Sequence, residues 1–228
     1  MGKISALLFA RLPDRGQVKT RLATGIGDDL ALDVYRWLAR KQAKALNDSG
    51  LSWQLWVTPR GRLEEAALWL PGAEKARDQC EGDLGKRMND AVEHAFAEGS
   101  RGVVLLGTDC PDLDAETLNQ LAAWAENGYF AILPAHDGGY AAMAMPKPYP
   151  AAFANIEWGS AWVMTRTVAI LEKGGNQAIL MQPVRDCDTL RDLRDIAERH
   201  PDCPYRPEVG SEAETAEIPA RTLPRGRE

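Results

Sequence analysis

The chain has 228 residues, of which 45% are hydrophobic and 26% are charged, and its formal net charge at pH 7 is −6. These values are typical of a globular protein, and they exclude disorder, collagen-like repeats and coiled coil for most of the chain. The acidic balance also argues against nucleic-acid binding through a generally basic surface, although a local basic pocket is compatible with it.

In chain order, the apolar pattern alternates between short strand-like runs and segments of helical period. It predicts strands at 3–10, 52–58, 102–107, 129–134, 140–145 and 178–184, and helices from residue 30 (with Asp28 or Asp29 as N-cap) and at 62–70, 83–98, 114–126, 161–173 and 189–199. This alternation indicates a doubly wound α/β structure. The run at 102–107 is the most continuously apolar, so we expect a central strand with parallel neighbours. The Gly138-Gly139 turn predicts one antiparallel strand pair.

The composition of two segments bears on domain organisation and location. Residues 1–200 are expected to form one domain, and 201–228, with five prolines, are expected to form a surface tail. The first apolar run, 6–10, is shorter than the roughly 7–15 residues of a signal peptide or the roughly 20 of a membrane span. The sequence therefore predicts a cytoplasmic protein without a membrane span. The four cysteines contain no CxxC pair and are expected to be reduced thiols.

A cluster of cations follows the first predicted strand, in the segment RLPDRGQVKTRL. Arg11, Arg15, Lys19 and Arg21 surround Gly16 there. Open α/β sheets bind ligands at the carboxyl ends of their strands, and a flexible turn with several cations at such an end suits a polyphosphate. The segment is not a Walker A loop, because it has only one glycine. The alternative interpretation is a solvated basic loop.

An aspartate closes the most apolar predicted strand, in the segment GTDCPDL. The chain delivers the Asp109 carboxylate to the edge of the sheet, where a hard cation such as Mg²⁺ takes carboxylate oxygens together with ligand phosphates. We therefore interpret Asp109 as a metal ligand. Asp112 and Asp114 precede a predicted helix, and we interpret both as N-capping residues.

Two more aspartates follow predicted strands. Asp137, in AHDGGY, lies beside two glycines that let a backbone approach a ligand closely, and the same Asp-Gly pair is a hairpin signal. Asp188, in DCDTLRDL, is either a second metal ligand or the N-cap of a helix in which Thr189 and Asp192 resemble a capping box. The cysteines next to Asp109 and Asp188 have no zinc-ligand spacing, so we expect inert buried thiols.

Five short motifs stand in order along the chain: GQVKTRL, QCEGDLGKRM, GTDCPDL, DGGY and WGS. As a set they resemble a bacterial family of glycosyltransferase A-like proteins, the rSAM/selenodomain-associated or arsenosugar-biosynthesis-type transferases. The resemblance spans roughly residues 4–195. It implies the nucleotide-diphospho-sugar transferase (GT-A) fold, a Rossmann-like three-layer α/β/α structure with a mixed, mostly parallel sheet. Sugar nucleotidylyltransferases share this fold with glycosyltransferases.

The resemblance also implies roles for residues at matching positions. These are Gly16, Lys19 and Arg21 in the loop that holds a triphosphate, Gln79 and Gly82 in a Gln-x-x-Gly segment that contacts the base, and Asp109 and Asp188 in the metal site. Arg11 adds a further cation for phosphate. The backbone N–H groups of Gly159 and Ser160, at the start of a predicted helix, would face an anion. Asp137 would orient the acceptor or act as its base.

These features together predict a nucleotide-binding transferase that depends on Mg²⁺ or Mn²⁺. In the favoured reaction, Lys19 neutralises phosphate charge while a glycosyl group passes from an NDP-sugar to a small-molecule acceptor. One alternative is a nucleotidylyltransferase that couples an NTP to a phosphorylated small molecule and releases pyrophosphate. Another is a catalytically degenerate nucleotide- or partner-binding module.

Overall fold

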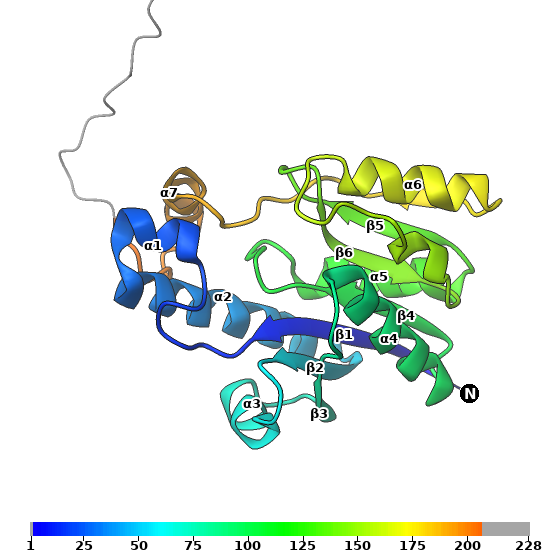
Figure 1. Cartoon of the computed structure of the whole chain (residues 1–228), viewed down its shortest axis with the longest axis horizontal. Helices are drawn as coiled ribbons and strands as arrows, with labels where there is room; N and C mark the ends of the chain where they lie inside the picture. The colour runs from blue at the N-terminus through cyan, green and yellow to red at the C-terminus, as the bar shows by residue number, and fades with distance from the viewer. Residues whose placement is uncertain (1, 207–228) are drawn as a thin grey trace, which may run out of the picture.

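The computed structural model describes residues 2–206 and is built around a seven-stranded sheet (Figure 1). The strand order is β3-β2-β1-β4-β6-β5-β7. The strands are β1 Ile4–Arg11, β2 Ser52–Thr58, β3 Lys75–Asp78, β4 Gly102–Leu106, β5 Phe130–Pro134, β6 Tyr140–Met145 and β7 Ala178–Leu180. Strand β6 is antiparallel to β4 and β5, and every other pair is parallel. The prediction of a mixed, mostly parallel sheet with a central buried strand at β4 is confirmed. The expectation of parallel neighbours for this strand is correct for β1 and wrong for β6, which runs antiparallel to it.

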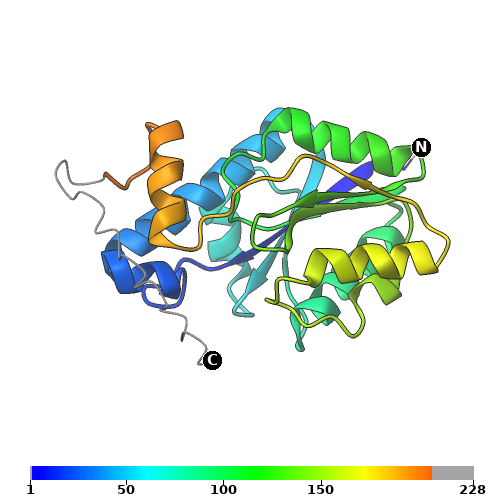
Figure 2. The same ribbon diagram turned by 90° about the horizontal axis from the view of Figure 1, so that it is seen from above.

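Helices cover both faces of the sheet, which gives three layers (Figure 2). They are α1 Thr20–Ile26, α2 Asp28–Ser49, α3 Leu63–Trp69, α4 Leu84–Ala97, α5 Ala115–Glu126, the 3₁₀ helix η1 Pro150–Phe153, α6 Val163–Lys173 and α7 Leu190–Arg199. Because side chains alternate along a strand, Leu8 packs with α2 and α5 whereas Leu7 packs with α4 and α6. Two apolar cores therefore lie against opposite faces of one sheet, as the three-layer expectation requires.

Several element boundaries differ from the prediction. Helix α2 begins at Asp28 with Gly27 as its N-cap, so the expected capping role of Asp28 or Asp29 is wrong. The last strand ends at Leu180, and beyond it a single bridge joins Ala135 and Val184. Strand β3, with the sequence KARD, was not expected because an edge strand of this kind carries almost no apolar signal.

The end of the described chain packs beside α1 and α2, away from the sheet (Figure 1). Helix α7 contributes Leu193 and Ile196 to a third apolar cluster, which also contains the buried Cys203 and Tyr205. The packed chain thus extends past the expected boundary at residue 200. The remainder of the expected tail, 207–228, lies outside the described residues.

All four cysteines are free thiols, as expected, and three of them are buried. Across residues 2–206, no helix is long and apolar enough to cross a membrane.

Candidate active site

A cleft of about 640 Å³ lies at the carboxyl ends of β1, β4 and β5. Its lining comes from the loop after β1, the loop after β4, the turn between β5 and β6, and the segment between β7 and α7. These parallel strands end on the same side of the sheet, where open α/β proteins bind ligands. The residues that the sequence singled out and that line this cleft are Arg11, Lys19, Arg21, Gln79, Asp109, Asp137, Gly159, Ser160 and Asp188. Gly16 and Gly82 do not line it.

Lys19 bridges the two aspartates that the sequence suggested as metal ligands. Its Nζ lies 2.7 Å from Oδ1 of Asp109 and 3.0 Å from Oδ1 of Asp188, and its side chain is only 7% exposed. Burial alone would lower the pKa of Lys19, but the two carboxylates outweigh it and raise that pKa above its ordinary value. Lys19 is therefore an ammonium that links the loop after β1 to two other segments.

The backbone around Lys19 is unusual as well. Lys19 has φ 47° and stands as the N-cap of α1 in the left-handed region, which non-glycine residues rarely occupy. The glycine at the turn of the same loop, Gly16, has φ 72°. Gly16 thus shapes the loop and lies outside the cleft lining, while Lys19 carries the charge into it.

Two polar side chains of α2 hold the loops that form the cleft. The Tyr35 hydroxyl accepts from Arg11 N at 2.9 Å and donates to Arg11 O at 2.7 Å, and burial raises the pKa of this hydroxyl to about 12. The buried Gln42 donates from Nε2 to the Cys110 carbonyl at 2.5 Å, one residue after Asp109. Sequence reasoning missed both, although each is a polar residue within the apolar stripe of α2.

Two acidic groups complete the cleft. Asp137 accepts a hydrogen bond from Gly139 N at 2.8 Å, which agrees with the expected turn, and β5 and β6 pair as a hairpin. Asp186, which the sequence analysis did not single out, also lines the cleft. Burial raises the Asp186 pKa, and the charges of Asp137 and Asp188 raise it further. Within residues 2–206, Asp137 and Asp186 thus line the cleft without a paired cation, whereas Asp188 is paired with Lys19.

This donor set fits one divalent cation. Asp109 and Asp188 present carboxylate oxygens to a common point and are 48% and 37% exposed. Within residues 2–206, no three His, Cys, Asp or Glu side chains are grouped to hold a metal by themselves. Mg²⁺ is commonly held by one or two carboxylates, with water and substrate phosphate completing its shell. The site thus suits a cation that arrives with a phosphate-bearing ligand, once the Lys19 ammonium gives way.

Of the two aspartates interpreted as N-capping residues, only Asp114 caps a helix. Asp114 caps α5 by accepting from Thr117 N at 2.8 Å, as predicted. For Asp112 the capping interpretation is wrong, because its carboxylate pairs with Arg199 and with His200 of the α7 end. Both partners lie almost 90 residues away, so local spacing gave no sign of them.

The start of α7 separates the two readings of Asp188. Thr189 caps α7, and Asp192 completes the capping box. Asp188 is therefore not the N-cap, and its carboxylate instead contacts Lys19.

The residues expected to bind base and anion are partly engaged within the protein. Gln79 is buried, and its Nε2 donates to the carbonyls of Ala10 and Trp56 at 3.3 and 2.9 Å. Helix α6 begins at Val163, and the Ser160 N–H donates to the Glu157 carbonyl at 3.2 Å. The Ser160 N–H would have to leave this bond to reach an anion.

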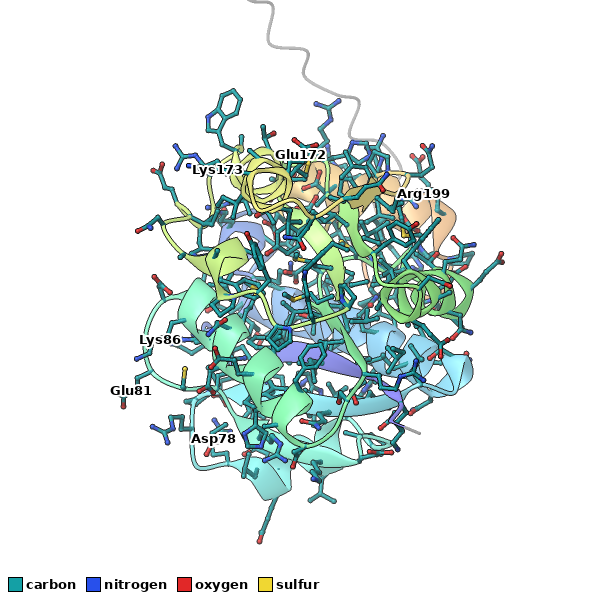
Figure 3. The ribbon with its side chains drawn as sticks, turned by 90° about the vertical axis from the view of Figure 1, so that its right-hand side faces the viewer. Asp78, Glu81, Lys86, Glu172, Lys173 and Arg199 are labelled. Carbon is teal, nitrogen blue, oxygen red and sulfur yellow. The ribbon has the colours of Figure 1, made fainter. Side chains whose placement is uncertain are left out.

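A second cavity of about 340 Å³ adjoins the cleft and shares Arg11, Gln17, Thr58, Gln79 and Arg87 with it. Its outer edge includes Glu81, which lies at the periphery of the molecule beside Lys86 (Figure 3). The second cavity adds Arg60 to the cations near Lys19, and Asp14 and Glu81 also line it.

The comparisons with known proteins agree with this geometry. Residues 41–160 match the family described as "Uncharacterized protein conserved in bacteria (DUF2064)". The chain belongs to this family. It is also similar, at 30% identity and TM-score 0.83, to a proposed nucleotide-diphospho-sugar transferase from Desulfovibrio desulfuricans G20, with 90% of this chain and 91% of that chain covered. No protein in a search of curated sequences matches this chain.

Two more distant structures show the same fold. One is a nucleotidyl transferase from Methanothermobacter thermautotroptrophicus, at 15% identity and TM-score 0.59, with 87% of this chain and 98% of that chain covered. The other is a 4-diphosphocytidyl-2C-methyl-D-erythritol synthase, at 14% identity and TM-score 0.58, with 86% and 97% covered. The fold expected from the sequence, that of nucleotide-diphospho-sugar transferases and nucleotidyltransferases, is confirmed.

Proposed function

We propose that this protein is a divalent-metal-dependent transferase that moves a glycosyl group from an NDP-sugar to a small acceptor. The observation that carries the proposal is the meeting of Lys19, Asp109 and Asp188 at one point of the cleft. Three segments far apart in the chain supply these groups, and each follows a strand of the sheet. The 30% identical nucleotide-diphospho-sugar transferase structure, which spans nearly the whole chain, supports the same donor class. So does the narrower resemblance to the rSAM/selenodomain-associated transferases.

The donor is proposed to lie along the cation-lined side of the cleft. Arg11, Arg21 and Arg87 line it beside Lys19, and guanidinium groups bind phosphate oxygens in pairs of hydrogen bonds. The adjoining cavity of about 340 Å³ has room for a nucleoside. Gln79, which the family resemblance places at the base, lines this cavity, and Gly82, the other residue of that motif, directly follows the lining residue Glu81.

Asp109 and Asp188 would hold Mg²⁺ or Mn²⁺, which stabilises the charge that develops on the departing phosphate. Lys19 would then turn its ammonium from the carboxylates to the diphosphate. The acceptor hydroxyl gives its proton to the Asp137 carboxylate as its oxygen bonds to the anomeric carbon. The bond from that carbon to the phosphate oxygen breaks, and its electron pair leaves with the NDP.

Nucleotidylyl transfer is the second candidate, and two observations favour it. Nucleotidyltransferases share the fold, and the several cations near Lys19 would suit three phosphates as well as two. In that reaction a phosphorylated acceptor attacks the α-phosphate of an NTP and pyrophosphate leaves. The two reactions differ in the released product, NDP or pyrophosphate.

The test is a thermal-shift panel of common NTPs and NDP-sugars, each with and without Mn²⁺. A nucleotide present at 100 times its Kd adds about 2.7 kcal/mol of stability, which corresponds to a rise in Tm of about 5–10 °C for a chain of this size. We expect one NDP-sugar to give this rise only with the metal, and turnover with that donor to release NDP. Pyrophosphate release from an NTP would select the second candidate. A panel in which nothing shifts would indicate a partner-binding module instead.

A further inference from the structure

The lining of the cleft is divided by charge. Its four cations come from three neighbouring places: Arg11 ends β1, Lys19 and Arg21 lie at the start of α1, and Arg87 lies in α4. The lining residues from position 135 onward include no lysine, arginine or histidine, among the residues that the structure describes. That half carries only acidic charge, from Asp137, Asp186 and Asp188.

The same half has an apolar and aromatic wall. Tyr140 of β6 and Trp158 meet edge to face, with ring centroids 6.4 Å apart and ring planes at 83°. Val163 adds to this wall, and Phe9, Leu105 and the α4 residues Leu84 and Met88 continue the apolar lining into the cation-lined half. Aromatic faces of this kind bind planar apolar groups.

Gly85 fixes the position of the Trp158 indole. A Cβ at residue 85 would lie 2.6 Å from Trp158 Nε1 and 2.5 Å from the Phe153 carbonyl. The indole can occupy its place only because α4 has no side chain at this position. The aromatic wall is thus a consequence of close packing between α4 and the segment before α6.

Lys19 offsets the charge of Asp188, but within residues 2–206 neither Asp137 nor Asp186 forms an ion pair. Arg185 precedes Asp186 but is exposed and pairs with Asp195 at 2.9 Å. A divalent cation at Asp109 and Asp188 would be balanced by the diphosphate that arrives with it. The Asp137 carboxylate lines this half without a paired cation, so an acceptor that carries phosphate or carboxylate would meet repulsion there.

We infer that the acceptor half of the cleft takes an uncharged or cationic small molecule with an apolar, planar group, and that it rejects phosphorylated and carboxylated acceptors. This inference rests on the proposed function, because it assigns the cation-lined half to the donor. It also bears on the reaction: a nucleotidylyltransferase that used a phosphorylated acceptor would need cations where this cleft has carboxylates and aromatic rings.

The test uses three probes that share a phenol ring and differ in charge: tyramine, tyrosol and 4-hydroxyphenylacetate. Ligand-observed NMR titration of the full chain with Mg²⁺ measures the three affinities. We expect tyramine to bind at least as tightly as tyrosol, and 4-hydroxyphenylacetate to bind at least tenfold more weakly. The Asp137→Asn variant should reduce the preference for tyramine over tyrosol about threefold or more, because it removes one of the facing negative charges.

Trp158→Ala should weaken all three probes alike, whereas the matched control Trp124→Ala, on α5 and outside the cleft lining, should change none of them. The charge series in the wild-type protein stands even where Trp158→Ala fails to fold. Equal or tighter binding of 4-hydroxyphenylacetate would overturn the inference, and so would failure of all three probes to bind. The nucleotide panel judges the proposed function separately, since donor binding there does not involve these probes.

Discussion

Replacing Lys19 by methionine would test the most unusual contact in the molecule. Lys19→Met keeps an unbranched side chain, one atom shorter, and removes the ammonium that joins Asp109 to Asp188. Removing one partner of a fully buried ion pair costs about 3–5 kcal/mol. Here the two carboxylates are 48% and 37% exposed, so water can solvate much of the charge that is left, and we expect a loss of about 1–2 kcal/mol. For a chain of this size that lowers Tm by about 2–8 °C.

The same substitution should strengthen metal binding. In the wild-type protein a divalent cation has to displace the Lys19 ammonium, whereas in Lys19→Met the two carboxylates are free to receive it. If the contact is worth about 1–2 kcal/mol, affinity for Mn²⁺ alone should rise about 5–30-fold. Affinity for the nucleotide should fall, because the variant lacks a cation for the diphosphate. Calorimetric titration with Mn²⁺, and then with an NDP, measures both changes.

An increase in Mn²⁺ affinity together with a decrease in nucleotide affinity is the result expected if the Lys19 ammonium and the metal ion compete for the two carboxylates. Mn²⁺ affinity that stays equal or weakens in Lys19→Met would refute the reasoning, because Lys19 would then not compete for the carboxylates. Lys44→Met is the matched control: Lys44 is 72% exposed and pairs with Asp48 on the surface of α2. It should leave both affinities unchanged and alter stability by less than about 1 kcal/mol.

Four further substitutions separate the site from its scaffold. Asp109→Asn should leave Tm nearly unchanged but abolish metal-dependent stabilisation by nucleotide, and a loss of about 4 kcal/mol of leaving-group stabilisation would slow turnover about 10³-fold. Gly138→Ala should lower Tm by several degrees, since Gly138 has φ +91° and a Cβ would lie 2.2 Å from the Ala161 carbonyl; Gly139→Ala, whose Cβ would meet nothing closer than 3.1 Å, should be much milder. Burial raises the pKa of Asp112, but its contacts with Arg199 and His200 have the larger combined effect and bring that pKa below its usual range. The Asp112 carboxylate should therefore stabilise the fold fully above about pH 4, and this contribution should decrease as the pH falls toward the folded-state pKa. Melting curves of the wild type and Asp112→Asn, taken stepwise downward from pH 6, should show the difference in Tm shrinking below about pH 4.

The sequence predicted which of the candidate site residues gather at one end of the sheet, because the signals for that placement are local. A buried apolar run that ends in Gly-Thr-Asp must place that aspartate at the edge of the sheet, and Asp109 lines the cleft accordingly. Of the four cations predicted around Gly16, Arg11, Lys19 and Arg21 line the cleft, whereas Arg15 is exposed and pairs with Asp29. Parallel strands end on the same side, so the order of strands and loops along the chain was sufficient.

Contacts between distant segments could not be predicted in this way. Lys19 is 90 residues from Asp109 and 169 from Asp188, and nothing in either motif indicates that an ammonium lies between the carboxylates. Asp186 and Asp188 both precede α7 and both line the cleft, but only Asp188 contacts Lys19, and no local pattern distinguishes the two. Tyr35 resembled an ordinary core residue of α2, and only the fold shows its hydroxyl at the end of β1.

Two costs coincide at Lys19, and together they favour a functional reading of the site. A non-glycine residue in the left-handed region costs about 1–2 kcal/mol, and an ammonium that is 7% exposed gives up most of its hydration. If stability alone had been selected, position 19, with φ 47°, would be glycine or asparagine, and the space that the Lys19 ammonium occupies would be filled by apolar atoms. Strained backbone and buried charge persist where surrounding structure holds them in place, and such positions cluster at ligand-binding and catalytic sites. Here the surrounding structure is the pair of carboxylates from two other loops, so the strain at Lys19 and the proposed cation site have one origin.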